Sequence, residues 1–329
     1  MEELYDPPFS ITNKIVDLIA EISEMIGHIT VMSGLHANPR LRRVNRIKTI
    51  QASLAIENNT LTVEQITALL DGKRILGSPQ EIREAQNAYE AYEHLLTFDP
   101  YSVKDLLKAH GILMAGLVKN AGSYRTGGVG VFAGTKVVHM APPAEFVAEH
   151  IRKLLKWYQK SSAHPLIKSA VFHYEFEFIH PFADGNGRMG RLWHTLLLCH
   201  WKEILAWIPV ETLVKERQND YYAALGAADK KADSTIFVEF MLTALRDMLL
   251  KIGVSDQVNS QVSDQVKKLL NVLGSRTLSA LELMEKLNLR HRPSFRKNYL
   301  NPAIASGLVE MTIPDKPNSR NQKYRKSET

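Results

Sequence analysis

Cysteine is almost absent from this chain. Cys199 is the single cysteine among 329 residues, and it lies inside an apolar run, so we expect a packed thiol rather than a nucleophile or a disulfide partner. The 12 histidines show none of the spacings of a zinc site. Neither a disulfide framework nor a structural zinc site is therefore expected.

Long apolar runs are missing as well. No stretch reaches the length that spans a bilayer, and the N-terminus, Met1 to Leu4, lacks a basic segment followed by an apolar signal region. The sequence therefore predicts a soluble cytoplasmic protein without a membrane partner. Because 45% of its residues are hydrophobic, the chain can bury a sizeable core, divided over two or three domains.

What the chain has in abundance is helical periodicity. Apolar residues recur at three- and four-residue spacing in six segments. These segments are residues 11–32, 79–96, 103–117, 144–158, 169–179 and 234–252. The sequence therefore predicts a mainly α fold, a helical body around one small β-hairpin.

The most informative segment is a short glycine-containing turn. Gly185, Asn186 and Gly187 precede an apolar run, so the turn should open a helix whose free N–H groups and positive dipole end face an anion such as phosphate. Arg188 and Arg191 lie three residues apart on that helix, where two guanidinium groups can clamp neighbouring phosphates. The pattern indicates a nucleotide-handling site.

A base and a metal ligand precede this turn. Asp184 is a hard oxygen ligand, suited to a Mg²⁺ ion that stays partly hydrated and bridges phosphates. His180 ends the preceding apolar stretch, and histidine is the side chain most often used as a general base, so it can remove a proton from an attacking hydroxyl. Base, metal ligand and cations together indicate phosphoryl-type transfer, in which catalysis is mostly positioning and electrostatics.

The same residues match the signature of the Fic family, His-x-Phe-x-Asp/Glu-Gly-Asn-Gly-Arg-x-x-Arg, at every specified position, so the chain resembles that family. The resemblance implies an all-helical core with a β-hairpin flap that transfers AMP from ATP to a hydroxyl of a target protein. It also implies individual roles: His180 as general base, Phe182 as a buried anchor, Asp184 as the Mg²⁺ ligand, Gly185 to Gly187 as the phosphate cradle, and Arg188 and Arg191 as ligands of the α/β and γ regions of ATP. The alternative is a helical corner with a core histidine and two solvated arginines.

An N-terminal helical stretch carries the run Ser53-Leu54-Ala55-Ile56-Glu57-Asn58. It resembles the inhibitory motif of the Fic family, Ser/Thr-x-x-x-Glu-Gly/Asn. The resemblance implies that Ser53, Glu57 and Asn58 form a regulatory element, in which Glu57 pairs with Arg191 where the γ-phosphate would bind. The alternative is that Glu57 is an ordinary exposed residue at a helix end.

Between the two motifs lies a glycine-rich stretch, residues 127–140, whose β-branched residues predict a short hairpin. By resemblance it is a flap that holds the modified segment of the target by strand addition. Val138, His139 and Met140 are then expected to contact nucleotide or target.

Farther along, Tyr221 and Tyr222 resemble the paired tyrosines that border adenine and ribose in the family. Some relatives have asparagine where this chain has Asp229, so the contact to the adenine edge and the choice of base stay open. For Tyr221 the alternative is packing inside the helical core.

The composition changes near Ser255. Four-residue repeats over residues 255–266 predict a polar linker leading into a new domain, with one continuous amphipathic helix as the alternative. Beyond it, three helical patterns and two strand-like pieces resemble a winged helix, which many Fic proteins carry. From Asp264 to Thr329 there are 13 lysines and arginines against six acidic residues, including a cluster at Arg290, His291, Arg292, Arg296 and Lys297. DNA is one partner for this basic module, and its own core, a second subunit or a target protein is the alternative.

The expected organisation is an N-terminal helical region with the inhibitory motif (1–100), a Fic core (101–252), and a linker with a winged-helix-like domain (253–329). The predicted function is an autoinhibited protein adenylyltransferase that uses ATP and Mg²⁺ to modify Tyr, Thr or Ser hydroxyls of a target, with self-modification and homodimer formation as further expectations. Two alternatives are an enzyme that removes AMP, with Glu57 orienting water, and a DNA-binding regulator whose core senses nucleotide.

Overall fold

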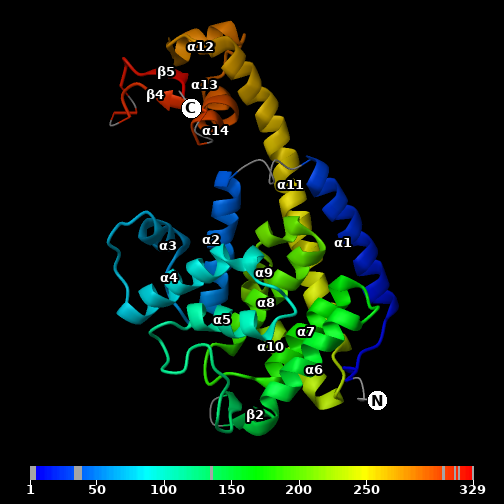
Figure 1. The fold of residues 1–329 in the computed structure, drawn as a ribbon. Helices are drawn as coiled ribbons and strands as arrows, with labels where there is room; N and C mark the ends of the chain where they lie inside the picture. Colours follow the sequence, from blue (N-terminus) through cyan, green and yellow to red (C-terminus); the bar gives the residue numbers. More distant parts are fainter. Residues whose placement is uncertain are drawn as a thin grey trace. The chain divides into compact units, whose positions relative to one another are not determined.

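The computed structural model describes residues 5–32, 39–133, 136–305, 308–314, 316–317 and 319–327, without the side chains of 31–32, 131–133, 136–139, 254–264 and 305. The chain forms two compact units, Met1–Lys251 and Ile252–Thr329. Most of the ordered structure is helical (Figure 1), as the periodicity predicts. In the described ranges, no helix combines the length and the apolar character needed to cross a membrane.

The first unit begins with helices that carry strong local signals at their N-termini. Ser78 caps a helix that starts at Pro79, and its side chain and that of Glu81 form a reciprocal capping box; Thr62 and Gln65 do the same one helix earlier. These elements are α1 (Asn13–Met32), α2 (Pro39–Ile56), α3 (Val63–Leu70), α4 (Pro79–Glu93) and the 3₁₀ turn η1 (Leu95–Thr97).

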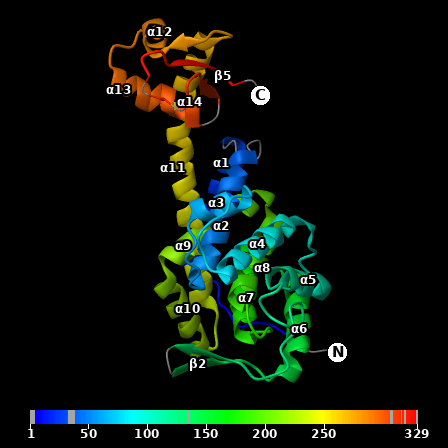
Figure 2. The ribbon, with the colours of Figure 1, turned by 90° about the vertical axis from the view of Figure 1, so that its left-hand side faces the viewer.

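The remaining elements of this unit surround two central helices. In chain order, with the two central helices α7 and α8 included, the elements are α5 (Val103–Leu113), β1 (Gly130–Ala133), β2 (Lys136–Met140), η2 (Ala144–Phe146), α6 (Val147–Lys160), α7 (Pro165–Ile179), α8 (Asn186–Trp201), η3 (Glu203–Trp207), α9 (Val210–Glu216), α10 (Gln218–Lys231) and α11 (Thr235–Leu273), whose residues from Ile252 onward belong to the second unit. Helices α7 and α8 pass through the middle of the unit (Figures 1 and 2), and most of their residues are buried. A helix that is apolar on nearly every face belongs inside a core, and the loop joining these two helices is therefore held on a rigid base.

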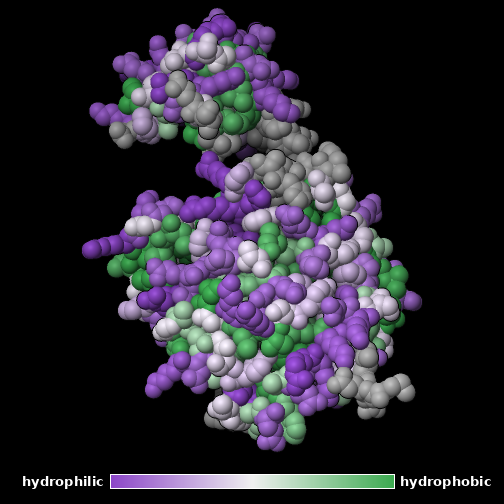
Figure 3. All heavy atoms as spheres, viewed as in Figure 1, coloured by the Kyte–Doolittle hydropathy of each residue, from purple (hydrophilic) through white to green (hydrophobic). Residues whose placement is uncertain are grey.

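The segment before α1 is tied to helices that are distant in sequence. Tyr5 donates its hydroxyl hydrogen to Glu175 on α7, the Trp157 indole donates to Asp6 at 3.1 Å, and Ser234 donates its backbone N–H to Pro8 O at 2.9 Å. Glu175 is only 4% exposed, so its hydrogen bond lies in a poorly hydrated place. On the face drawn in Figure 3, apolar side chains lie in small separate groups among polar ones.

The second unit has its own apolar core, with residues such as Leu269, Leu283, Phe295 and Tyr324 each at most 3% exposed. Its elements after α11 are β3 (Leu278–Ser279), α12 (Ala280–Lys286), α13 (Arg292–Phe295), the π-helical turn η4 (Arg296–Leu300), α14 (Asn301–Ala305), β4 (Val309–Met311) and β5 (Lys323–Lys326). The strands form an antiparallel sheet in the order β3-β5-β4. The four-residue repeats near Ser255 left two interpretations open, a polar linker and one continuous helix. The backbone of this segment is helical, as part of α11, which corresponds to the continuous helix.

Candidate active site

The loop between α7 and α8 is built on two left-handed backbone positions. His180 closes α7 with φ 49°, and its backbone N–H donates to Phe176 O at 3.0 Å. Gly185 stands before α8 with φ 82°, and a Cβ added there would lie 2.5 Å from Met114 Sδ. The turn requires glycine at 185 for two reasons, because any side chain would strain the backbone and meet Met114.

The side chain of Asn186 closes the same loop. It donates to Phe182 O and accepts from Phe182 N, each at 2.8 Å, and the residue is 3% exposed. If Asn186 takes part in a phosphate cradle, as expected from the sequence, its backbone N–H is the group left to do so. Its side chain fixes the shape of the turn and is not directed at a ligand.

Phe182 anchors the loop against a histidine that sequence reasoning missed. The ring of His110, on α5, stacks on Phe182 with centroids 3.6 Å apart and planes 3° apart. His110 Nδ1 accepts from Gly122 N–H at 2.9 Å, so Nε2 carries the hydrogen and donates to Asp184 O at 3.1 Å. Burial lowers the pKa of His110, which favours this neutral form. Sequence reasoning missed His110 because it lies on the buried face of an amphipathic helix, where the periodicity of the sequence does not distinguish it from a core residue without a functional role.

Arg191 belongs to the first half of α8 and is 2% exposed. Its Nε donates to Ser53 Oγ and its Nη2 to Ser53 O, each at 3.0 Å, and Nη2 also donates to Glu57 Oε1 at 2.7 Å. Burial lowers the pKa of Arg191, but Glu57, together with the nearby Tyr221 and Glu177, raises it by more, so the pKa lies above its ordinary value. The contact between Glu57 and Arg191 that the resemblance implies is present, and Ser53 supports it.

The end of α2 explains how Glu57 is presented. Asn58 has φ 66°, its N–H donates to Ala55 O at 3.2 Å, and the N–H of Asn59 donates to Leu54 O at 3.2 Å. These are the two hydrogen bonds of a Schellman turn, which needs a residue that tolerates the left-handed region. Gly or Asn fits at position 58 for this physical reason, so Asn58 acts through the backbone.

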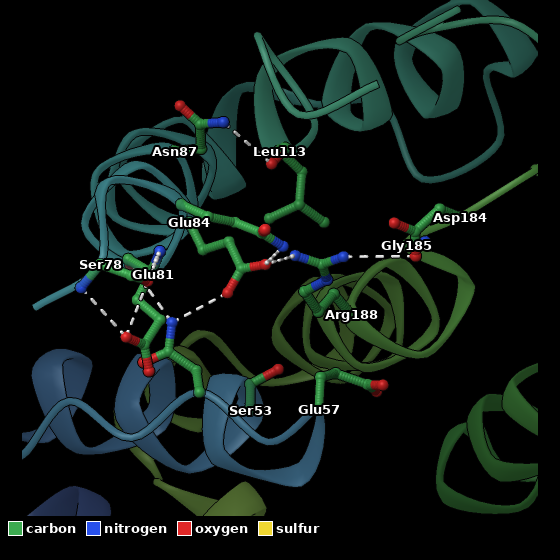
Figure 4. A network of polar contacts seen from close by, with 12 residues as sticks. Ser53, Glu57, Ser78, Glu81, Glu84, Asn87, Leu113, Asp184, Gly185 and Arg188 are labelled. Atoms are coloured by element: carbon green, nitrogen blue, oxygen red, sulfur yellow. Dashed lines mark hydrogen bonds and ion pairs between the residues drawn. The ribbon is translucent and has the colours of Figure 1, made fainter. Parts of the chain in front are cut away.

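Arg188 is directed differently from Arg191. It is 7% exposed, its Nη1 lies 3.3 Å from Glu84 Oε1 on α4, and its Nη2 lies 3.4 Å from Asp184 Oδ1 (Figure 4). The sequence analysis placed both arginines as a clamp on phosphates. In the structure each arginine is held by a different carboxylate from the N-terminal helices, and Glu84 is a residue that the sequence motif did not include.

The side chain of Asp184 remains accessible, with 61% of its surface exposed. Its Oδ1 accepts from Gly185 N–H at 2.6 Å, which leaves room at the carboxylate for a cation. Within the described part of the chain, no three His, Cys, Asp or Glu side chains gather into a metal cluster. One exposed carboxylate beside an anion-binding helix start fits Mg²⁺, which keeps several waters and takes other ligands from phosphates.

Arg125 connects the His180 loop to the β-hairpin and also escaped sequence reasoning. Its Nε donates to His180 O at 2.7 Å, while its Nη atoms donate to Gly127 O at 2.8 Å and Pro142 O at 2.5 Å. Gly127 and Pro142 lie at the two ends of the hairpin, and Arg125 is 5% exposed. One buried guanidinium thus fixes the backbone of the catalytic histidine candidate and both ends of the flap.

The hairpin itself is antiparallel, with Gly130 paired to Met140 and Val131 to His139. The register shifts after Val131, because Phe132 pairs with Val137, so Val138 is an extra residue on β2. The side chains of Val138 and His139 lie outside the described residues, and Met140 is 67% exposed.

The residues expected around adenine separate into two groups. Tyr221 is 1% exposed and its hydroxyl lies 3.1 Å from His173 Nε2, which corresponds to core packing, the alternative left open for it. Tyr222 is 47% exposed and available to a ligand. Asp229 accepts a hydrogen bond from the Tyr174 hydroxyl at 2.9 Å.

Two family profiles match this chain. The Fic/DOC family matches residues 100–198, and the C-terminal domain of the "Filamentation induced by cAMP protein Fic-like" family matches residues 264–327. The chain is similar to "Protein adenylyltransferase fic-1" of Caenorhabditis elegans, with 27% identity over 67% of this chain, and to "Protein adenylyltransferase Fic" of Drosophila mojavensis, with 30% identity over 70% of this chain. It spans only 43% and 47% of the length of these two relatives.

A solved structure extends the similarity over the whole chain. The crystal structure of a Fic family protein from Desulfovibrio desulfuricans shares 55% identity, covers 99% of each chain and superimposes with a TM-score of 0.76. A structure of Fic-1 from C. elegans covers 73% of this chain with 25% identity and a TM-score of 0.58. With the complete signature on the α7–α8 loop, two matching profiles and a full-length structural relative, the chain belongs to the Fic family.

Proposed function

We propose that this protein is an autoinhibited protein adenylyltransferase, which transfers AMP from ATP to a hydroxyl group of a target protein. One observation carries the proposal. The ion pair of 2.7 Å between Glu57 and Arg191 is made at the helix start of a complete Fic signature, where phosphate would bind. The names of the curated relatives support AMP transfer as the reaction.

The reaction follows from the residues of the α7–α8 loop. His180 accepts the proton of the target hydroxyl while the hydroxyl oxygen forms a bond to the α-phosphorus of ATP. The bond between the α-phosphorus and the bridging oxygen breaks, and pyrophosphate leaves. The α8 helix start, Arg188 and Arg191 stabilise the phosphate charge. A Mg²⁺ ion held by Asp184 would add neutralisation of phosphate charge.

Inhibition follows from competition for one place. A Cβ built on Gly187 would lie 2.4 Å from Glu57 Oε1, so the carboxylate lies directly over the backbone that a phosphate would approach. A carboxylate and a γ-phosphate cannot both use this position, because they compete for Arg191 and repel each other. ATP then binds weakly or with its α-phosphate misplaced for attack.

The target segment is proposed to add to the flap as an extended strand. Backbone pairing would align a Tyr, Thr or Ser hydroxyl while reading little of the target's sequence. Arg125 supports this arrangement, because it joins both ends of the flap to the backbone of His180. The same mode permits self-modification.

The experiment is the intact mass of wild type, Glu57→Gly and Glu57→Gly/His180→Ala after incubation with ATP and Mg²⁺, with a cell lysate as target pool. The expected result is added AMP on the protein or on lysate proteins with the single variant alone. Equal transfer by wild type and Glu57→Gly would remove the inhibitory role of Glu57. No added mass with any variant, despite ATP binding, would remove the transferase assignment.

Removal of AMP is the second candidate, and the position of Glu57 favours it. Its side chain is 36% exposed beside the anion site, so it can reach a water molecule as well as Arg191. A labelled AMP-protein that is released by wild type but not by Glu57→Gly would support this activity. The remaining alternative, a DNA-binding regulator, is supported by the positive charge of the second unit alone, for which we propose a winged-helix fold from its order of helices and strands.

A further inference from the structure

Glu84 is a carboxylate of α4 that lies outside the Fic signature and outside the inhibitory motif. Its Oε1 lies 3.3 Å from Arg188 Nη1, with only 12% of the Glu84 side chain and 8% of the Arg188 side chain exposed (Figure 4). Solvent and salt screen such a pair poorly. The contact therefore constrains where the guanidinium of Arg188 can lie.

Glu84 is in turn held by a buried amide. Asn59, which is 6% exposed, donates from Nδ2 to Glu84 Oε2 at 2.9 Å and to Glu81 O at 3.2 Å. Its Oδ1 accepts from Leu61 N–H at 3.1 Å. Because a buried polar group without a partner costs free energy, the carboxylate of Glu84 cannot turn away without taking from the Asn59 amide one of its two acceptors, which leaves only Glu81 O.

Asn59 belongs to the Schellman turn that presents Glu57. Its backbone N–H donates to Leu54 O, and it follows Glu57 by two residues. One turn after α2 therefore reaches both arginines of the signature, Arg191 directly through Glu57 and Arg188 through Asn59 and Glu84.

We propose that Glu84 is a positioning residue that orients Arg188 for the phosphates of ATP, and that Asn59 makes this orientation depend on the turn after α2. The proposal rests on the proposed function for its ligand. Arg188 has five N–H donors, so contacts with Glu84 and Asp184 leave donors for phosphate oxygens. If the side chain of Arg188 is already ordered before ATP binds, the binding step does not carry the entropic cost of ordering it. Glu84 and phosphate have like charge, but the ion pair with Arg188 and the hydrogen bond from Asn59 reduce their repulsion. The entropic gain is therefore larger than the free energy lost to repulsion.

Nucleotide binding tests this inference apart from AMP transfer. The full chain with Glu57→Gly serves as the parent, and calorimetric titration gives its dissociation constant for ATP with Mg²⁺. Adding Glu84→Gln keeps the shape and removes the charge. We expect the dissociation constant to rise roughly tenfold, as when an outer partner that orients a binding group is lost. In AMP transfer, the change should fall on KM for ATP more than on kcat.

The matched control is Glu81→Gln in the same parent. Glu81 lies on α4, as Glu84 does, and it also connects this helix to the segment after α2. Its carboxylate accepts hydrogen bonds from Ser78 and Thr60 instead of contacting Arg188. Its loss should change the dissociation constant by less than about twofold, since exposed contacts contribute little. An equal effect of both variants would reduce Glu84 to a structural role and overturn the proposal.

Asn59→Ala gives a second and independent variant. It should weaken ATP binding in the parent, and it should have little further effect once Glu84→Gln is present, because the two residues act through one contact. Additive effects, or ATP binding by Glu84→Gln as tight as in the parent, would refute the inference. Absence of ATP binding by the parent itself would instead remove the proposed function, and this inference with it.

Discussion

Gly187 and Glu57 share one space at the start of α8. A Cβ on Gly187 would lie 2.4 Å from Glu57 Oε1 and 3.1 Å from Arg191 Nη1, so the carboxylate occupies the gap that the missing side chain leaves. A glycine inside a helix usually costs stability relative to alanine. Its presence here indicates that the gap serves an anion, which is Glu57 within the protein and, on the proposed function, a phosphate.

Replacing this glycine should separate stability from activity. In the Glu57→Gly protein, Gly187→Ala should change the free energy of unfolding by less than about 1 kcal/mol, because the gain expected for a helical position is offset by the approach of the new Cβ to Arg191 Nη1, 3.1 Å away. The same change should lower AMP transfer on the order of a hundredfold, because phosphate can no longer approach the backbone. Thermal unfolding and intact-mass kinetics measure the two effects. Unchanged transfer would show that phosphate does not use this surface.

Ser53 should stabilise the buried Arg191. Ser53→Ala removes the oxygen that accepts from Arg191 Nε at 3.0 Å, in a place where the two residues are 4% and 2% exposed. A buried donor without a partner costs about 1–3 kcal/mol, so denaturant unfolding should show a loss of that size. Ser53→Thr, which keeps the hydroxyl, is the control. A Ser53→Ala protein as stable as wild type would mean that Arg191 finds another acceptor.

Arg125 should govern catalysis without governing ATP affinity. In the Glu57→Gly background, Arg125→Lys keeps the charge but cannot span His180 O, Gly127 O and Pro142 O at once. We expect kcat to fall about 10- to 100-fold because base and target segment lose their alignment. The dissociation constant of ATP should stay near that of the parent, since the arginines of α8 are untouched. A preserved kcat would argue against this coupling.

Glu175 should make stability depend on pH. Burial raises the pKa of this carboxyl to about 7, and nearby Asp229 adds to the rise, although the hydrogen bond from Tyr5 opposes it. The folded state thus holds the proton more tightly than the unfolded state, so stability falls as pH rises from about 4.5 to about 7 and is constant above. The full loss is roughly 3 kcal/mol.

The measurement is the thermal midpoint of wild type and Glu175→Gln between pH 5 and 8. Glutamine has no charge to bury and its oxygen still accepts from Tyr5, so the advantage of the variant should grow as pH rises from 5 to about 7 and stay constant from there to pH 8. Parallel curves would show that Glu175 is ionised in the folded protein at all of these pH values.

Sequence reasoning succeeded where residues close together in the chain determine the local structure. The α7–α8 loop and the end of α2 are short segments whose glycines, Asn58 and charged residues each have a local reason, and the structure has the pair between Glu57 and Arg191. It failed for Arg125 and His110, because a lone polar residue in a loop or on a helix has no pattern until its neighbours in space are known. Tyr221 shows the converse, since a residue chosen for a ligand packs in the core.

The sequence by itself determined the mainly helical class, the signature loop, the motif at the end of α2 and the excess of positive charge in the second unit, because these depend on residues close together in the chain. Only the tertiary structure decided which carboxylate meets which arginine. Glu57 and Arg191 are 134 residues apart, and Glu84 and Arg188 are 104 apart. Such pairs form only when several helices pack at fixed positions, and that packing is set by the shape of a whole core rather than by any local pattern.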